Sequence, residues 1–116
     1  MRIEIKRVYE APAADDGYRI LVDRLWPRGV SKERAAVELW AKEVSPSTAL
    51  RKWFGHEPNK WLEFQERYRA ELAENRAALD ELRDIIKDQE TVTLVYGAKV
   101  TEYGHAQVLR DVLLGA

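Results

Sequence analysis

A long helical pattern at residues 58–88 constrains the fold of this chain more than any other feature. Apolar residues recur there at steps of three and four: Trp61, Phe64, Tyr68, Leu72, Leu79, Leu82 and Ile86. One straight helix over this range would run about 46 Å, whereas a compact chain of 116 residues is about 35 Å across. The helix must therefore break or protrude, and Asn75 is where a break would do least harm. The sequence leaves open whether the range holds one helix or two.

Segments with strand patterns lie on both sides of this helical range. Residues 18–25 (YRILVDRL) have the apolar centre of a strand buried on both faces, and residues 91–96 (TVTLVY) are rich in β-branched side chains. Residues 1–9 alternate weakly, and residues 37–44 fit a strand slightly better than a helix. With an amphipathic helix expected at residues 102–114, the order predicts an α/β fold. We expect a small Rossmann-like layered domain whose four-stranded, mostly parallel or mixed sheet is flanked by helices.

The connection between the first two strands bears on their relative direction. Only about eight residues separate them, whereas a parallel crossover usually needs a dozen or more. This short joint favours a mixed sheet and leaves the orientation of the first strand open. Residues 1–116 contain no repeat or linker pattern, so a single domain is expected.

Composition excludes several kinds of protein. The chain has no cysteine, which rules out disulfides and thiolate catalysis, and its two histidines make a metal site or cofactor unexpected. No apolar run reaches the length of about 20 residues that a membrane span needs, and a cytoplasmic protein fits best. The net charge of −1 gives no general attraction for nucleic acid. Residues 1–60 carry a basic excess and residues 61–116 an acidic one, so an anionic partner could approach one face.

The first candidate site follows the strand at residues 18–25. Ligands of open α/β sheets bind beyond the carboxyl ends of the strands, and Asp23, Arg24 and Arg28 lie there. The two guanidinium groups suit a phosphate or carboxylate. Gly29 would let backbone amides approach an anion, and Ser31 would add a hydroxyl and cap a short helix. The structural alternative is that Asp23 pairs with an arginine to stabilise the joint.

A second candidate segment is a short helix predicted at residues 48–54, which Ser47 would cap. Arg51 and Lys52 add positive charge, but they point to different sides of such a helix, so at most one should face a given pocket. Lys52 fits a surface charge better. His56 follows the helix and would be a general acid or base near neutral pH, or simply a structural histidine.

The end of the last predicted strand points to the same sheet edge. Lys99 lies just beyond this strand, and His105 lies in the first turn of the final predicted helix. A neutral imidazole or a bound anion is favoured at that position. Two segments far apart in the sequence are thus expected to meet where an α/β sheet binds its ligands.

Several stretches resemble a known family. KRVYE, LVDRLWPRG, LRKWFGH, TVTLVYGAK and GHAQVL resemble the YeaO-like branch of the domain-of-unknown-function 488 family, and the resemblance covers nearly the whole chain in order. It implies a small cytoplasmic Rossmann-like domain and supplies no reaction. Asp23 and Arg24 fall on the D-x-R pattern of longer relatives, and His105 on their Cys-His-Arg pattern. Gly104 and Ala106 stand where Cys and Arg would be, so thiol chemistry does not carry over.

These patterns support one main function and two alternatives. The main hypothesis is a protein, either an enzyme or a sensor, that binds a small phosphate- or carboxylate-bearing ligand at the strand carboxyl edge, with His105 or His56 as the catalytic group. A nucleic-acid module would instead use Trp53, Phe54 or Trp61 as a stacking platform. A protein-interaction domain would use the helical pattern after residue 61. A monomer and a homodimer both remain open.

Overall fold

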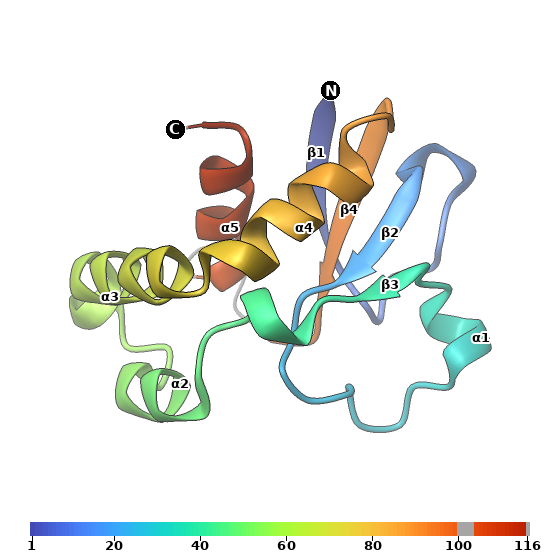
Figure 1. The fold of residues 1–116 in the computed structure, drawn as a ribbon. Coiled ribbons are helices and arrows are strands. Elements are labelled where there is room, and N and C mark those ends of the chain that lie inside the picture. Colours follow the sequence, from blue (N-terminus) through green and yellow to red (C-terminus); the bar gives the residue numbers. More distant parts are fainter. Residues whose placement is uncertain (100–103, 116) are drawn as a thin grey trace.

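The computed structural model describes residues 1–99 and 104–115, and these form a four-stranded sheet (Figure 1). The strands are β1 (Arg2–Arg7), β2 (Tyr18–Leu21), β3 (Leu39–Trp40) and β4 (Thr91–Tyr96). Their order across the sheet is β1-β4-β2-β3, and every neighbouring pair is parallel. The predicted α/β class is confirmed, in its fully parallel form.

The short joint before β2 does not prevent a parallel sheet, so the preference for a mixed sheet was wrong. β4 lies between β1 and β2, and residues 8–17 therefore return along the sheet and cross one intervening strand. Ten residues reach about 33 Å when extended, and a four-residue strand with two strand spacings needs less. No helix is needed in this crossover; it holds only a 3₁₀ turn, η1 (Ala14–Asp16).

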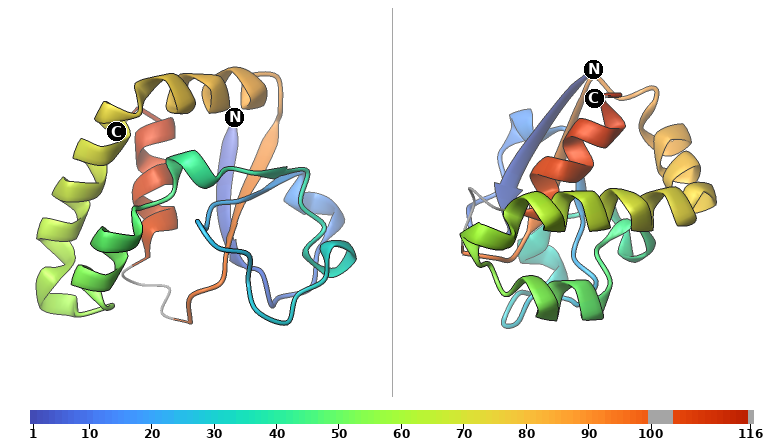
Figure 2. Two further views of the ribbon diagram at one scale, coloured as in Figure 1. Left: turned by 60° about the horizontal axis from the view of Figure 1, so that its bottom comes forward. Right: turned by 90° about the vertical axis from the view of Figure 1, so that its left-hand side faces the viewer.

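The helices are α1 (Lys32–Ala35), α2 (Thr48–Phe54), α3 (Trp61–Glu74), α4 (Arg76–Ile86) and α5 (His105–Leu113), with 3₁₀ turns η2 (Lys42–Val44) and η3 (Pro58–Lys60). Helices α2 to α5 gather on one side of the sheet, and α1 lies on the other (Figure 2). Residues 37–44, for which strand and helix were both considered, contain the short strand β3 followed by the 3₁₀ turn η2. Of the predicted final helix, residues 102–103 lie outside the described residues.

The long helical pattern is broken at Asn75, the position expected from the sequence. Asn75 has φ −106° and ψ 44°, which is not helical, and it separates α3 from α4. Its side-chain nitrogen donates to the carbonyl of Glu43 at 2.6 Å. The bend lets α3 pack against α2 and α5, while α4 covers η2. The pattern is used for packing within this chain, which removes the motivation for a coiled-coil partner along it.

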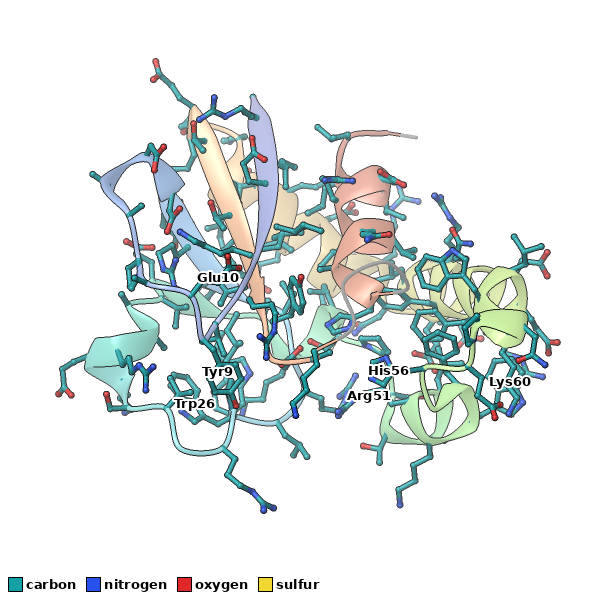
Figure 3. The ribbon with its side chains drawn as sticks, turned by 180° about the vertical axis from the view of Figure 1, so that it is seen from behind. Tyr9, Glu10, Trp26, Arg51, His56 and Lys60 are labelled. Carbon is teal, nitrogen blue, oxygen red and sulfur yellow. The ribbon has the colours of Figure 1, made fainter. Side chains whose placement is uncertain are left out.

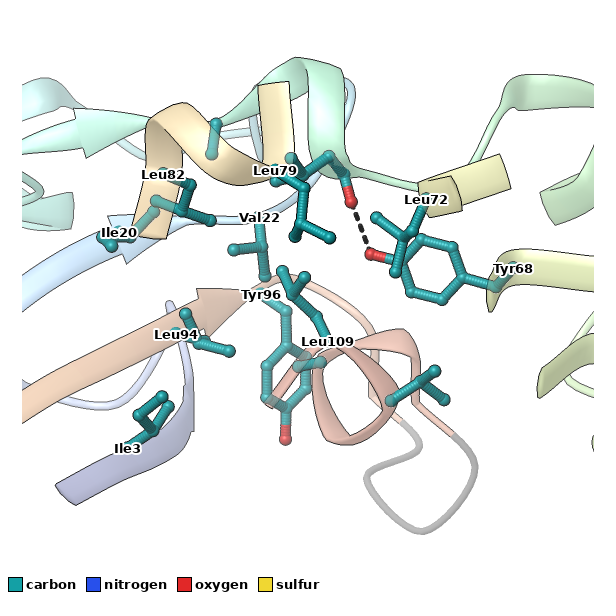
Figure 4. Close-up of a cluster of buried hydrophobic side chains, with 14 of the residues drawn as sticks. Ile3, Ile20, Val22, Tyr68, Leu72, Leu79, Leu82, Leu94, Tyr96 and Leu109 are labelled. Atoms are coloured by element: carbon teal, nitrogen blue, oxygen red, sulfur yellow. Dashed lines mark hydrogen bonds between the residues drawn. The ribbon is translucent and has the colours of Figure 1, made fainter. Parts of the chain in front are cut away.

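The main core lies between the sheet and these helices (Figure 4). Alternate residues of the strands point into it, among them Ile3, Ile20, Val22, Leu94 and Tyr96. Tyr68 of α3 is fully buried, and its hydroxyl donates to the carbonyl of Val44 at 2.5 Å. Burial is the main reason why the pKa of Tyr68 is raised far above its usual value. This hydrogen bond ties α3 to the segment that leads into α2.

The opposite face of the sheet carries a smaller core and a buried group of charges. Val8, Val30, Ala35 and Val95 form the apolar part. Beside it, Arg19 donates to Asp16 at 2.6 Å and to the carbonyls of residues 35 and 36. Lys6 completes the group, with its ammonium 3.1 Å from Asp16. In the part of the chain that the structure describes, the four-residue α1 is the helix on this face, so the charges hold η1 and α1 against the strands.

Candidate functional site

A pocket of about 560 Å³ opens where β1, β2 and β4 end (Figure 3). Because the strands are parallel, their carboxyl ends meet at this edge, as expected for a ligand site in an α/β sheet. Its lining comes from the strand ends, from α2 and the residues around it, and from the start of α5: Tyr9, Asp23, Leu25, Trp26, Pro27, Thr48, Arg51, Lys52, Phe54, His56, Phe64, Gly97, Ala98 and His105. Pockets of this size take organic ligands.

Asp23 and His105 form the centre of the site. One Asp23 carboxylate oxygen lies 3.1 Å from Nε2 of His105, and the other accepts the backbone N–H of Gly97 at 2.8 Å. Nε2 of His105 is also 2.9 Å from the carbonyl of Val22. Both neighbours of Nε2 are acceptors, so this nitrogen carries a proton. The contacts join the ends of β2 and β4 to the start of α5.

Gly97 allows this close contact because it has no side chain. A Cβ at residue 97 would lie 3.1 Å from the carboxylate oxygen of Asp23 and 3.8 Å from Cβ of Pro27. These distances place Gly97 between Asp23 and the loop that holds Trp26 and Pro27. A larger residue here would push the carboxylate away from the backbone N–H.

Arg51 and Lys52 supply positive charge to the pocket, and His56 lies beside them. They are exposed, and all three border it. The expectation that at most one of Arg51 and Lys52 would face the pocket was wrong, because α2 runs along a wide opening and two adjacent positions both reach it. Among residues 1–99 and 104–115, the structure shows no hydrogen bond or ion pair to the side chain of Arg51. Its guanidinium group can therefore receive an anion without breaking an existing contact.

Helix α2 is held in place by Ser47 and Glu71. The hydroxyl of Ser47 accepts the backbone N–H of Leu50 at 3.1 Å, which caps the helix as predicted. That hydroxyl donates to Glu71 at 2.5 Å, and the backbone N–H of Ser47 donates to the same carboxylate at 2.9 Å. The fixed start of α2 sets the position of Arg51 one turn later. Ser47 thus supports the site without lining it.

The environment of His56 favours its neutral form. Partial burial lowers its pKa from the usual 6.5, and electrostatic interactions with His105 and Arg51 lower it further. An anion bound beside these groups would offset their charge. Its binding and the protonation of His56 should therefore favour each other.

We expect sulfate to raise the pKa of His56, and the affinity for sulfate to increase as the pH falls from 7.5 through that pKa. Sulfate keeps its charge over this range, so only the protein titrates. The measurement is an NMR titration of the His56 ring protons with and without sulfate, together with binding by wild type and the His56→Gln variant. A pKa of His56 that ignores sulfate would contradict the prediction.

Tyr9 and Trp26 form an aromatic wall of the pocket. Trp26 is half-buried, and its indole N–H donates to the carbonyl of Val30 at 2.6 Å. Tyr9 follows β1, and its hydroxyl donates to the carbonyl of Arg28 at 3.1 Å. Both rings are held by their polar ends while their apolar parts border the pocket. Sequence reasoning missed Tyr9; its position directly after a strand was the available signal.

The structure separates the predicted site residues into two groups. Asp23, Arg51, His56 and His105 line the pocket. Arg24 does not, because its guanidinium donates to the carbonyls of Ser45 at 2.7 Å and Pro46 at 3.1 Å. It connects the end of β2 to the segment before α2.

The remaining predicted residues lie away from the lining. Arg28 and Lys99 are exposed and do not border the pocket. Gly29 has a positive φ of 77°, and a Cβ there would meet nothing within 4 Å. Ser31 caps α1, because its hydroxyl accepts the backbone N–H of Arg34 at 3.1 Å. Their proposed role in ligand binding stays a prediction.

The aromatic residues considered for nucleic-acid stacking are engaged elsewhere. Phe54 is buried and stacks on Phe64, with ring centroids 4.3 Å apart. The guanidinium of Arg67 lies 4.2 Å from the ring centroid of Trp53, and Trp61 packs against Phe54 and Phe64. These rings stabilise the contact between α2 and α3. They do not form an open platform for bases.

In residues 1–99 and 104–115, no three His, Asp or Glu side chains come together as they would around a metal ion. Over the same ranges, none of the helices has both the length and the apolar character that crossing a membrane requires.

Comparison with known proteins identifies relatives along the whole chain. The sequence model of a family described as the inactive DUF488-N3 subclade matches residues 2–116. The uncharacterized protein YeaO of Escherichia coli K12 is 50% identical over 111 residues, which is 96% of each chain. An uncharacterized protein of Mycobacterium bovis is 43% identical over 114 residues, 98% of this chain and 95% of the relative. No solved structure gives a significant match.

Proposed function

The chain belongs to the DUF488 family, in the branch described as inactive, and from this premise we propose that it binds a small anionic ligand in the pocket beyond β1, β2 and β4. The ligand carries a phosphate or a carboxylate. The description of the branch supports binding without turnover. Gly104 and Ala106, which stand where the resemblance implies Cys and Arg, support the same view. If the protein does catalyse a reaction, His105 and His56 are the groups that would transfer protons.

The observation that carries the proposal is the free guanidinium group of Arg51 at a concave site. Within the described residues it has no hydrogen-bonding partner, and Lys52 adds a second positive charge beside it. Asp23 is the acidic residue of the described lining, and its two oxygens already accept from His105 and Gly97. An anion at the α2 side of the pocket would therefore find unused donors, and guanidinium groups suit phosphate and carboxylate.

We expect the Arg51→Ala variant to bind a phosphate-bearing ligand about 10- to 100-fold more weakly than wild type. The reason is the loss of a charge-assisted hydrogen bond, which is worth about 1.5–3 kcal/mol. The measurement is an amide-shift NMR titration with ribose 5-phosphate. Wild-type shifts should be saturable and should cluster at residues 48–56, at Gly97 and at the start of α5.

Two variants serve as controls for Arg51→Ala. Arg34→Ala removes an exposed arginine from α1, on the other side of the sheet, and should leave the affinity unchanged. Arg28→Ala tests the position that the sequence favoured. The proposal fails if phosphate- and carboxylate-bearing ligands cause no saturable shifts in this pocket, or if Arg51→Ala binds as tightly as wild type. Shifts only with a single-stranded oligonucleotide would replace it with nucleic-acid binding.

A further inference from the structure

The pocket is larger than an inorganic anion requires. Its volume of about 560 Å³ falls in the range of sites that hold organic molecules. The lysine and the arginine of the lining lie on α2, while apolar residues such as Leu25, Trp26 and Ala98 border much of the rest. The site is thus built for a ligand with an anionic end and a larger, less polar body.

Two aromatic residues of the pocket, Tyr9 and Trp26, lie opposite its α2 side. In Figure 3, Tyr9 and Trp26 lie together at one side of the site, and Arg51 and His56 lie at the other. Both rings are held at their polar ends by backbone carbonyls, and the guanidinium of Arg7 lies over the Tyr9 ring, 5.1 Å from its centroid. Each ring therefore keeps its orientation before a ligand arrives. Fixed aromatic faces favour a planar partner, because such a partner covers them without ordering any side chain.

Asp23 lines the same pocket, beside Gly97 and His105. The backbone N–H of Gly97 donates to Asp23, and a Cβ on Gly97 would lie 3.8 Å from Pro27, the neighbour of Trp26. The other oxygen of Asp23 contacts His105. His105 in turn interacts electrostatically with His56. A carboxylate in the lining repels an anion and attracts a hydroxyl or amino donor. The pocket therefore combines aromatic rings, a carboxylate and cations.

Building on the proposed function, we infer that the ligand is a nucleoside monophosphate or a molecule of that chemistry: a planar heterocycle, a hydroxyl-bearing spacer and a terminal phosphate. The heterocycle packs against Tyr9 and Trp26. The hydroxyl groups of the spacer donate to Asp23. The phosphate accepts hydrogen bonds from Arg51, with His56 and Lys52 beside it.

The experiment compares four probes by NMR titration of the full chain: adenosine 5′-monophosphate, ribose 5-phosphate, adenosine and inorganic phosphate. Stacking of a base on an aromatic ring strengthens binding by at least about fivefold. We therefore expect adenosine 5′-monophosphate to bind at least fivefold more tightly than ribose 5-phosphate. Adenosine and inorganic phosphate should both bind more weakly than the nucleotide, because each engages one end of the pocket.

A matched pair of variants tests the aromatic end. Tyr9→Leu keeps an apolar side chain but removes the ring, and should weaken binding of the nucleotide at least fivefold while leaving ribose 5-phosphate unaffected. Tyr9→Phe keeps the ring and should retain the affinity for the nucleotide. Tyr9 is 39% exposed, so both variants should fold, and their thermal unfolding curves would verify this. Arg51→Ala should weaken both phosphates alike.

The outcomes separate the inference from the proposed function. Equal affinity of wild type for the nucleotide and for ribose 5-phosphate, or equal loss of both in Tyr9→Leu, would overturn the inference and leave anion binding in place. If neither phosphate binds, or if adenosine binds as tightly as the nucleotide and Arg51→Ala has no effect, the proposed function falls and the inference falls with it.

Discussion

Replacing Asp16 with asparagine is expected to lower the free energy of unfolding by about 3–5 kcal/mol, the usual cost of removing one partner from a buried ion pair. The carboxylate of Asp16 lies 2.6 Å from the guanidinium of Arg19 and 3.1 Å from the ammonium of Lys6. Arg19 is only 3% exposed. Without the negative charge at residue 16, two cations would remain in a largely water-free site.

Asp16 also holds the backbone around it. Its carboxylate accepts the N–H of Ala13 at 3.0 Å, and its carbonyl accepts the hydroxyl of Thr93 at 2.7 Å. Arg19 extends the group to the carbonyl of Ala35 at the end of α1. The second face of the sheet has only a small apolar core, so these polar contacts fix η1 and α1 there.

Urea or thermal unfolding, followed by circular dichroism, would measure the effect of Asp16→Asn. A loss of this size corresponds to a fall in Tm of roughly 12–25 °C for a chain of this length. Asp15→Asn is the matched control, because Asp15 is the neighbouring acid in the same turn and is exposed. It should change the stability by no more than about 0.5 kcal/mol. Equal stabilities of the two variants would show that the buried charges contribute nothing.

The pH dependence of this difference has a definite sign. Burial raises the pKa of Asp16, but the N–H of Ala13 and the cations of Lys6 and Arg19 outweigh it, so the folded pKa lies below the usual 3.8. A carboxyl group with a lowered folded pKa stabilises the protein above its unfolded pKa. The gap between wild type and Asp16→Asn should therefore be complete near neutral pH. It should close as the pH falls below 3.8 toward the folded value.

The fold was largely predictable because its signals are local. The segment 91–96 became β4 without change, and Ser47 caps α2 as expected. The break at Asn75 followed from comparing the length of the helical pattern with the size of the chain. The direction of β1 could not be derived in this way, because it depends on the insertion of β4 between β1 and β2. Strand order is a property of the tertiary structure and cannot be derived from the length of a linker.

The candidate site was predictable in its place but not in all its residues. The rule that ligands bind at strand carboxyl ends led to Asp23 and His105, which line the pocket and contact each other directly. It could not show that Arg24 would turn to the carbonyls before α2. A guanidinium group can donate its hydrogen bonds to an anion or to backbone carbonyls, and only the tertiary structure determines which acceptors it meets. Tyr9 was missed because an aromatic residue after a strand more often belongs to a core.

Replacing Gly17 with alanine is expected to destabilise the protein by at least about 3 kcal/mol, the combined cost of backbone strain and of a forced displacement. Gly17 leads directly into β2 and has φ 66° and ψ −133°, a conformation that residues with a side chain rarely adopt. A Cβ at this position would lie 2.2 Å from the carbonyl oxygen of Thr91. Because both groups are backbone, β2 and β4 would have to move apart at their first residues.

Gly29→Ala provides the control that separates strain from collision. Gly29 also has a positive φ, 77°, but its Cβ would meet no atom within 4 Å. In this variant the free energy of unfolding should fall only by the cost of the left-handed conformation, about 1–2 kcal/mol. Urea unfolding of both variants would give the difference, which reports the contact between residue 17 and β4 alone. If both variants lose the same stability, residue 17 is not packed against Thr91 as closely as the structure shows. The placement of β2, and of Asp23 beyond its other end, would then be contradicted.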